Sequence, residues 1–301
     1  MSVIGIIAAL LLEQWRPLAE RRSVAGAVGA WAAWLEQSFN GGEPRHGVVA
    51  WLVAVLPAAL VAAVLHVLLY LVHPLLALAF NIAVLYLTLG FRQFSHHFTA
   101  IQLATKSGNI EQAREQLEIW RGATGVVRSR EELIRLAIEE ALVASHRHVF
   151  GVLLWYILLP GPSGAVLYRL AAYFAARWRS LGVFGGFAQR AFYFLEWPAV
   201  RLTAVAFAVV GDFEDAIYCW RTQARAWLDP NAGIVLAAGA GAMGVRLGMP
   251  VQELDGMHPR PELGLGEPAD GPFLDSTVGL VWRALVVWVF VLIVISVARL
   301  L

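Results

Sequence analysis

The chain of 301 residues contains little charge and a single cysteine. Charged residues make up 15% of it, against about a quarter in an ordinary soluble protein, and the formal net charge is +1. So small a net charge gives no bulk attraction to a polyanion, and we expect no nucleic-acid partner. The lone Cys219 excludes an internal disulfide framework and a metal site built from several cysteines.

Long hydrophobic runs replace the missing charge, and hydrophobic residues amount to 59% of the chain. Residues 48–72 carry no charge and are long enough to cross a hydrocarbon core of roughly 30 Å. A second apolar run follows His73-Pro74, so the sequence predicts a transmembrane hairpin over 48–91. Residues 278–298 predict a C-terminal transmembrane helix. We therefore expect an all-α, polytopic helical membrane protein in contact with the lipid bilayer.

Residues 149–176 are also apolar and long enough to span a membrane, but the run Pro160-Gly161-Pro162-Ser163-Gly164 interrupts them. Irregular backbone inside a bilayer persists only where protein or a water-filled cavity covers it. Two alternatives remain open, a re-entrant hairpin and a straight crossing. The arginines of residues 177–277 would lie in the cytoplasm only with a re-entrant hairpin, so the charge pattern favours that alternative.

Residues 92–148 are rich in cationic side chains and are typical of soluble helices. Asn109 and the pair Ser129 and Glu132 have the spacing of helix N-caps. The positive-inside rule places this segment in the cytoplasm, and we expect residues 177–277 to be cytoplasmic or interfacial. The whole chain, 1–301, is thus interpreted as one membrane domain of a bacterial inner membrane whose main soluble segments face the cytoplasm.

Few polar residues have a spacing that points to chemistry. The neighbouring histidines of His96-His97 and of His146-x-His148 face different ways on a helix and have no acidic residue at ligand spacing, so we expect no metal site. No G-x-x-x-x-G-K-[ST] phosphate loop and no G-x-S-x-G elbow occurs. Glu139 follows Arg135 by four residues, a spacing typical of a helix-stabilising ion pair.

The stretch 229–248, D-P-N-A-G-I-V-L-A-A-G-A-G-A-M-G-V-R-L-G, is too glycine-rich for an ordinary transmembrane helix and too apolar for a linker. Glycines at this density let the backbone approach other backbone or a ligand closely. The sequence therefore predicts close packing or a bound ligand here. Arg246, near its end, stands between apolar residues and glycines.

This stretch resembles a signature of the CobD/CbiB family. Pro230–Gly233 is similar to that family's P-N-A-G, and Gly241–Gly248 to its G-A-L-G-V-R-L-G. Further pieces resemble family motifs in the same order along nearly the whole chain: Arg92 to His97, Gly108 to Arg114, Arg135 to Glu139, Tyr168-Arg169 and Arg201 to Ala204. The resemblance implies an adenosylcobinamide-phosphate synthase, a membrane amide ligase of cobalamin biosynthesis.

The chain departs from the family pattern where that pattern is acidic. The positions that match E-N-x-x-D-G and D-D-x-x-N are occupied by Val143, Ala144, Arg147, His148, Phe192, Tyr193 and Glu196. ATP-dependent amide formation needs carboxylates to hold Mg²⁺ and phosphates. These losses resemble AmpE, a membrane relative described as a sensor or regulatory protein. We therefore expect a non-catalytic regulatory, sensory or accessory protein, and the alternative is an active ligase that uses ATP and Mg²⁺.

No residue is assigned a catalytic or metal-binding role from the sequence. Arg169 and Arg201 lie in apolar stretches, where a charge needs a partner carboxylate, a ligand anion or the membrane interface. We expect a residual site that faces the cytoplasm and takes an unknown small molecule, or that serves a membrane partner protein. Its candidate ligand-binding residues are Arg135, Glu139, Arg169, Arg201, Asn231, Gly233, Gly244 and Arg246.

Overall fold

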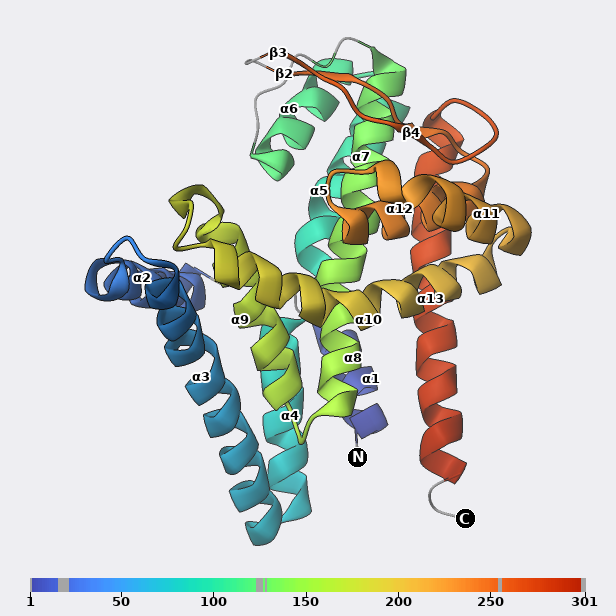
Figure 1. Cartoon of the computed structure of the whole chain (residues 1–301). Helices are drawn as coiled ribbons and strands as arrows, with labels where there is room; N and C mark the ends of the chain where they lie inside the picture. The colour runs from blue at the N-terminus through green and yellow to red at the C-terminus, as the bar shows by residue number, and fades with distance from the viewer. Residues whose placement is uncertain (1, 16–21, 123–126, 128, 254–255, 299–301) are drawn as a thin grey trace. The chain divides into compact units, whose positions relative to one another are not determined.

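The computed structural model describes residues 2–15, 22–122, 127, 129–253 and 256–298, and this part of the chain is helical apart from two short strand pairs (Figure 1). The expected fold class, an all-α polytopic membrane protein, is confirmed. Among the described residues, four helices are long and apolar enough to cross a membrane: Pro44–Val72, Arg130–Leu158, Gly186–Val210 and Gly271–Ala298. Large apolar side chains remain exposed on them, among them Leu71 and Phe290.

The chain divides into two compact units, and each combines segments that are distant in the sequence. Unit 1 comprises Met1–Gly90 and Arg147–Trp197, and unit 2 comprises Phe91–His146 and Pro198–Leu301. The elements that lie in unit 1 are α1 (Ser2–Trp15), α2 (Arg22–Phe39), α3 (Pro44–Val72), α4 (Pro74–Thr88), α8 (Gly151–Leu158), α9 (Ser163–Arg177) and the 3-10 helix η2 (Arg179–Leu181). The π-helix η1 (His146–Phe150) and helix α10 (Gly186–Val210) contain the boundaries between the units.

Unit 2 contains most of segment 92–148, whose sequence is typical of soluble helices, and most of segment 177–277. Its helices are α5 (Phe91–Lys106), α6 (Ile110–Arg121), α7 (Arg130–Ser145), α11 (Phe213–Gln223), the 3-10 helix η3 (Ala224–Ala226), α12 (Pro230–Met243) and α13 (Gly271–Ala298). Its strands form two antiparallel pairs, β1 (Leu247–Gly248) with β4 (Glu262–Leu263) and β2 (Val251–Glu253) with β3 (Gly256–His258). These short strands are a feature that the sequence did not lead us to expect.

In unit 1, α3 and α4 meet at His73, where the sequence places the turn. His73 is extended and donates its backbone N–H to the Leu69 carbonyl at 2.9 Å, which ends α3. Pro74 then begins α4, because its fixed φ suits the first helical turn and its missing N–H would have no partner there. The His73 ring accepts a hydrogen bond from the Leu75 N–H at 3.2 Å. Two apolar helices are thus joined by one residue.

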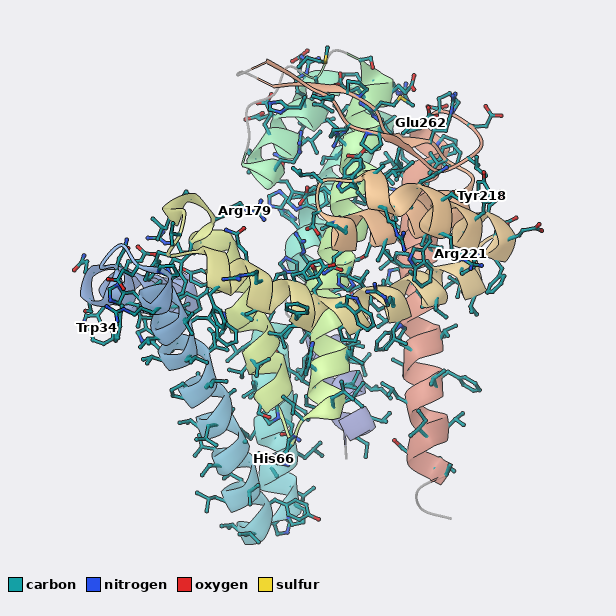
Figure 2. The ribbon with its side chains drawn as sticks, viewed as in Figure 1. Trp34, His66, Arg179, Tyr218, Arg221 and Glu262 are labelled. Carbon is teal, nitrogen blue, oxygen red and sulfur yellow. The ribbon has the colours of Figure 1, made fainter. Side chains whose placement is uncertain are left out.

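Helices α8 and α9 form a second hairpin in unit 1, with a sharp turn between antiparallel helices (Figure 1). The turn falls at the predicted break and includes Gly161, whose φ is +58°. The ring of His66 on α3 fills the space where a Cβ of Gly161 would be, and Figure 2 shows His66 close to this turn. The chain therefore reverses direction within 149–176, and whether this segment crosses a membrane or re-enters it stays a prediction.

Two long helices differ from the segments that we expected from the sequence. Residues 130–158 form one continuous apolar helix of α7, η1 and α8, so no break occurs between residues 148 and 149. Helix α10 lies within 177–277, which we expected to be cytoplasmic or interfacial, although its length and composition would also allow a membrane crossing. The location of these segments relative to a membrane stays a prediction.

The N-caps in unit 2 follow the predicted chemistry. The Asn109 side chain accepts a hydrogen bond from the Gln112 N–H at 3.2 Å, and Ser129 accepts one from the Glu132 N–H at 3.1 Å. In the same way Asp212 begins α11. Each cap satisfies an N–H group that the first helical turn leaves without an intrahelical partner. N-cap residues such as these therefore allow the start of a helix to be predicted from the sequence.

The α8–α9 hairpin depends on direct contact between backbones. A Cβ at Gly164 would overlap the carbonyl oxygen of Trp155. We expect Gly164→Ala to destabilise the protein by roughly 1–3 kcal/mol, the usual effect of overpacking. The measurement is thermal unfolding of the purified protein in detergent. Gly186→Ala is the control, because no heavy atom lies within 4 Å of a Cβ built there; equal unfolding temperatures for the two variants would contradict this packing.

Cys219 on α11 is fully buried, and its thiol should be inert. Desolvation, with the nearby charge of Asp215 as a smaller cause, raises the pKa of Cys219 to about 11. The reactive thiolate is therefore scarce at pH 8 and increases only as the pH approaches 11. We expect negligible maleimide labelling of the native protein at pH 8 and rapid labelling after denaturation in dodecyl sulfate. Fast labelling of the native protein at pH 8 would show that the thiol is accessible.

Candidate functional site

Helix α12 carries the glycine-rich element and is buried on every side from Asn231 to Ala242. It begins after Asp229, whose carboxylate accepts the Asn231 N–H at 3.1 Å. It ends at Gly244, where φ is +66°, a left-handed conformation that favours glycine. A fully buried helix made mostly of alanine and glycine brings its own backbone close to its neighbours. This helix is the centre of unit 2's packing.

The glycines of α12 contact protein backbone. A Cβ at Gly233 would overlap the carbonyl oxygen of Ala224, and one at Gly241 would overlap that of Asp215. Glycine at these positions is required by packing, and the gain in contact offsets its loss of backbone freedom on folding. Gly244 has open space around its Cα and is needed for its φ. A ligand contact of Gly233 or Gly244 stays a prediction.

The end of the glycine-rich element is held by two predicted residues of α7. The backbone N–H of Gly248 donates to Oε1 of Glu139 at 2.8 Å, and the Gly248 carbonyl accepts a hydrogen bond from Arg135. Arg260 completes the cluster, with its Nη1 donating to Oε2 of Glu139 at 2.8 Å and its Nη2 to the Gly248 carbonyl at 3.3 Å. Arg135 and Glu139 are both buried. The predicted i, i+4 neighbours therefore act together on one distant backbone unit.

This network stabilises an unusual turn. Gly248 and Met249 both have positive φ, +79° and +66°, and Met249 is the non-glycine residue with this conformation in the described part of the chain. Arg260 donates its Nε–H to the Met249 carbonyl at 3.1 Å and stacks over the Trp227 ring, 5.1 Å from its centroid. The hydrogen bonds on both sides over-determine the turn and keep it in place.

Arg260 is the residue of this cluster that sequence reasoning missed. It lies 121 residues after Glu139, in a stretch with no repeating spacing. A pair of this kind is visible only after folding, because only contacts within a helix or a turn leave a spacing in the sequence. No pattern in the sequence could have assigned Arg260 to Glu139.

Arg246 is presented by a rigid backbone but is only loosely paired. Its backbone N–H donates to the Glu267 carbonyl at 2.9 Å, and the Glu267 N–H donates to the Gly244 carbonyl at 3.1 Å. Its Nη1 lies 3.7 Å from Oε1 of Glu262, a residue of β4 that is labelled in Figure 2. The Arg246 side chain is 39% exposed, while its Nε is buried and has no hydrogen-bond partner in the described part of the structure. Arg246 thus retains donors for an anion.

The other predicted residues lie on different elements. Asn231 is buried at the start of α12, and Arg201 is half-buried on the portion of α10 that belongs to unit 2. Arg169 belongs to unit 1, where its Nη1 lies 3.2 Å from Nδ1 of His148. The structure therefore brings Arg135 and Glu139 to the glycine-rich element and gives Arg169 a separate set of contacts within its own unit.

The described residues contain no group of three or more His, Cys, Asp or Glu side chains close enough to hold a metal ion. Both oxygens of Glu139 already accept hydrogen bonds from N–H groups. Mg²⁺ prefers several oxygen ligands, and a carboxylate engaged by Arg260 is a poor one. A resident Mg²⁺ ion therefore does not fit this cluster.

The Glu139 network should be a major stabilising feature. Glu139→Gln would remove one negative charge beside the buried Arg135 and the half-buried Arg260, and breaking a fully buried ion pair costs roughly 3–5 kcal/mol, which is the upper limit here. We expect a large fall in the unfolding temperature. Glu111→Gln is the matched control: Glu111 pairs with Arg114 at 3.0 Å but its side chain is 80% exposed, so a loss of about 1 kcal/mol or less is expected. Similar stability of the two variants would rule out a structural role for the network.

Curated proteins similar to this chain come from several bacteria. A protein of Stutzerimonas stutzeri (strain A1501), named cobalamin biosynthesis protein CobD, is 37% identical over 301 residues, which cover 97% of each chain. A protein of the same name from Chromobacterium violaceum is 36% identical over 227 residues, 71% of this chain and 70% of its own. A third, from Mycobacterium tuberculosis, is 40% identical over 88 residues, 28% of each chain.

These comparisons correct one expectation from the sequence. The non-catalytic regulatory or sensory role is wrong, because the relatives that match most of the chain are named cobalamin biosynthesis protein CobD. The AmpE-like character receives no support from them. The expectation rested on acidic residues missing from particular positions, but buried carboxylates are present in the fold, at Glu139 and at Glu196. The absence of an acidic residue at one position of the sequence does not show which carboxylates and arginines lie together in the folded protein.

No solved structure matches this chain. The family model described as CobD/Cbib protein matches residues 6–298. The chain belongs to the CobD/CbiB family.

Proposed function

We propose that this protein acts in cobalamin biosynthesis as an adenosylcobinamide-phosphate synthase, an ATP-dependent amide ligase. The observation that carries the proposal is the similarity to cobalamin biosynthesis protein CobD over 97% of both chains. The interlocked Arg135–Glu139–Gly248 cluster supports it, because it joins two separate pieces of the family pattern into one rigid element. The substrates would be a corrinoid carboxylate and an aminopropanol phosphate.

The reaction needs the carboxylate to be activated. Its oxygen would attack the γ-phosphorus of ATP, which gives an acyl phosphate and releases ADP. The amine nitrogen would then attack the acyl carbon, which forms the amide and releases phosphate and a proton. Each reactant carries an anionic group, so the protein must supply positively charged donors at defined positions. Arginine suits this task because its planar guanidinium binds phosphate and carboxylate with two parallel hydrogen bonds.

Arg246 is our candidate for such a donor in unit 2. Its backbone is fixed on both sides by Glu267, and its guanidinium is partly exposed with only a 3.7 Å contact to Glu262. Arg135, Glu139 and Arg260 would act as positioning residues, because they hold Gly248 two residues away. Asn231 and Arg201 remain candidate polar contacts. In this assignment the glycine-rich element has a structural role, because it positions Arg246.

We further propose that the protein lies in a bacterial inner membrane with this site on the cytoplasmic side. The excess of arginine in residues 92–147 supports that orientation by the positive-inside rule. The supply of ATP in the cytoplasm agrees with it.

The test is amide formation by the full chain purified in detergent. With adenosylcobyric acid, aminopropanol phosphate and ATP with Mg²⁺ in the buffer, we expect an amide product by mass spectrometry and none without ATP. Arg246→Gln should lower kcat/KM roughly tenfold or more, since hydrogen bonds to charged groups contribute about 1.5–3 kcal/mol.

Arg221→Gln is the matched control, because Arg221 is an exposed arginine of α11 (Figure 2) and should be replaceable without effect. Absence of any amide product from folded, monodisperse protein would refute the proposed function. Equal kcat/KM for Arg246→Gln and wild type would refute the role given to Arg246 alone.

A further inference from the structure

A π-helix interrupts the long apolar helix where it enters unit 1. The five residues His146–Phe150 form this element, between α7 and α8. A π-turn inserts an extra residue, widens the helix and frees backbone groups, and such turns occur frequently at functional sites. Here the carbonyl of His148 accepts a hydrogen bond from the Gly90 N–H at 3.2 Å. Arg147 and His148 both belong to this irregular turn.

Polar side chains gather around this π-helix within unit 1. Nε of Arg147 donates to Oε1 of Glu196 at 2.7 Å, and the Glu196 side chain is only 3% exposed. Nη1 of Arg169, on α9, lies 3.2 Å from Nδ1 of His148. A guanidinium can only donate, so His148 accepts through Nδ1 and carries its proton on Nε2 in this contact. In this contact Arg169 therefore pairs with the neutral imidazole of His148, which does not cancel its positive charge.

Tyr168 lies in the middle of these groups and is fully buried. Its ring is 5.5 Å from that of Phe192, over which the Arg147 guanidinium also lies, 5.8 Å from the centroid. Its electrostatic neighbours are Glu196, Arg147 and Arg169. Its hydroxyl end contacts Gly151, where any side chain would overlap it. The Tyr168 side chain can therefore occupy this space only because residue 151 is a glycine.

The Tyr168 hydroxyl has no hydrogen-bond partner among the described residues, although the side chain is 0% exposed. A buried hydroxyl without a partner is destabilising, and such groups are rare in folded proteins. Phenylalanine would fill the same space without that penalty. The hydroxyl is therefore expected to have a partner that is not part of the unit itself. A ligand next to Arg169 and Arg147 would be negatively charged.

We propose that this cluster in unit 1 is a binding site for an oxyanion of the phosphate-monoester type. The Tyr168 hydroxyl would donate to a phosphate oxygen, and Arg169 and Arg147 would neutralise its charge. Glu196 would hold Arg147 in position, and His148 would hold Arg169. The phosphate could belong to a free substrate or to a lipid headgroup. The choice of aminopropanol phosphate as probe rests on the proposed function, whereas the site itself rests on the contacts above.

Calorimetric titration of the full chain in detergent would test this site with two probes, aminopropanol phosphate and inorganic phosphate. We expect Tyr168→Phe to weaken aminopropanol phosphate binding roughly tenfold or more. Its unfolding temperature without ligand should equal or exceed that of the wild type, because no internal hydrogen bond is lost. Arg169→Gln should also weaken binding.

Matched controls lie on the same helix. Tyr173→Phe and Arg177→Gln should bind like the wild type, since Arg177 is exposed and donates to Glu36 at 3.0 Å. Reconstitution in nanodiscs with and without phosphatidylglycerol separates the two sources of phosphate. If the headgroup is the ligand, then aminopropanol phosphate will bind only in nanodiscs without anionic lipid, and this competition will be lost in Tyr168→Phe.

Wild-type affinity of both Tyr168→Phe and Arg169→Gln for the probe would overturn the proposal. So would a lower unfolding temperature of ligand-free Tyr168→Phe, because the hydroxyl would then have an internal partner. The amide assay separates this inference from the proposed function. Tyr168-dependent phosphate binding without any amide formation would refute the function and leave the site. Amide formation by Tyr168→Phe with an unchanged KM for aminopropanol phosphate would refute the site and leave the function.

Discussion

The backbone of Gly248 carries the interaction on which the arrangement of unit 2 depends. Glu139 accepts its N–H, and Arg135 donates to its carbonyl. Only glycine fits here, because φ is +79° and a Cβ would overlap the Pro261 carbonyl. These two bonds fix the backbone two residues after Arg246, whose own N–H donates to the Glu267 carbonyl. Helix α7 and the turn at Gly248, which is far away in the sequence, are therefore held together as one structural unit.

Two buried carboxylates of this apolar chain accept hydrogen bonds from arginines, Glu139 from Arg260 in unit 2 and Glu196 from Arg147 in unit 1. Such pairing is required, because an isolated charge or polar group in a low-dielectric interior is strongly destabilising. Buried donors without a recorded hydrogen-bond partner then stand out against this background. They include Nε of Arg246 and the Tyr168 hydroxyl, and the latter lies near Arg147 and Arg169.

Much of the fold could be predicted because its signals are local. Caps such as Asn109 act within one helical turn, and the break before Gly164 lies in five consecutive residues. The candidate site is different. Arg135 and Glu139 have the spacing of a local ion pair, yet both act on a residue more than a hundred positions away. Long-range partners such as Arg260 leave no spacing in the sequence, so the cluster could be predicted only in part.

The expectation of a non-catalytic protein failed for the same reason, because residue spacing in the sequence does not give contacts between distant residues. The argument counted acidic residues missing from a sequence pattern, whereas an enzyme needs charges at positions in space. Glu196 stood in a segment interpreted as depleted, but it comes from α10 to meet Arg147 on the π-helix. The proposed reaction also joins a carboxylate to a phosphate-bearing amine and uses ATP, so each of its reactants carries an anionic group. For such substrates, replacing an acidic residue by Arg147 changes which group the site can hold; it does not remove the ability to hold one.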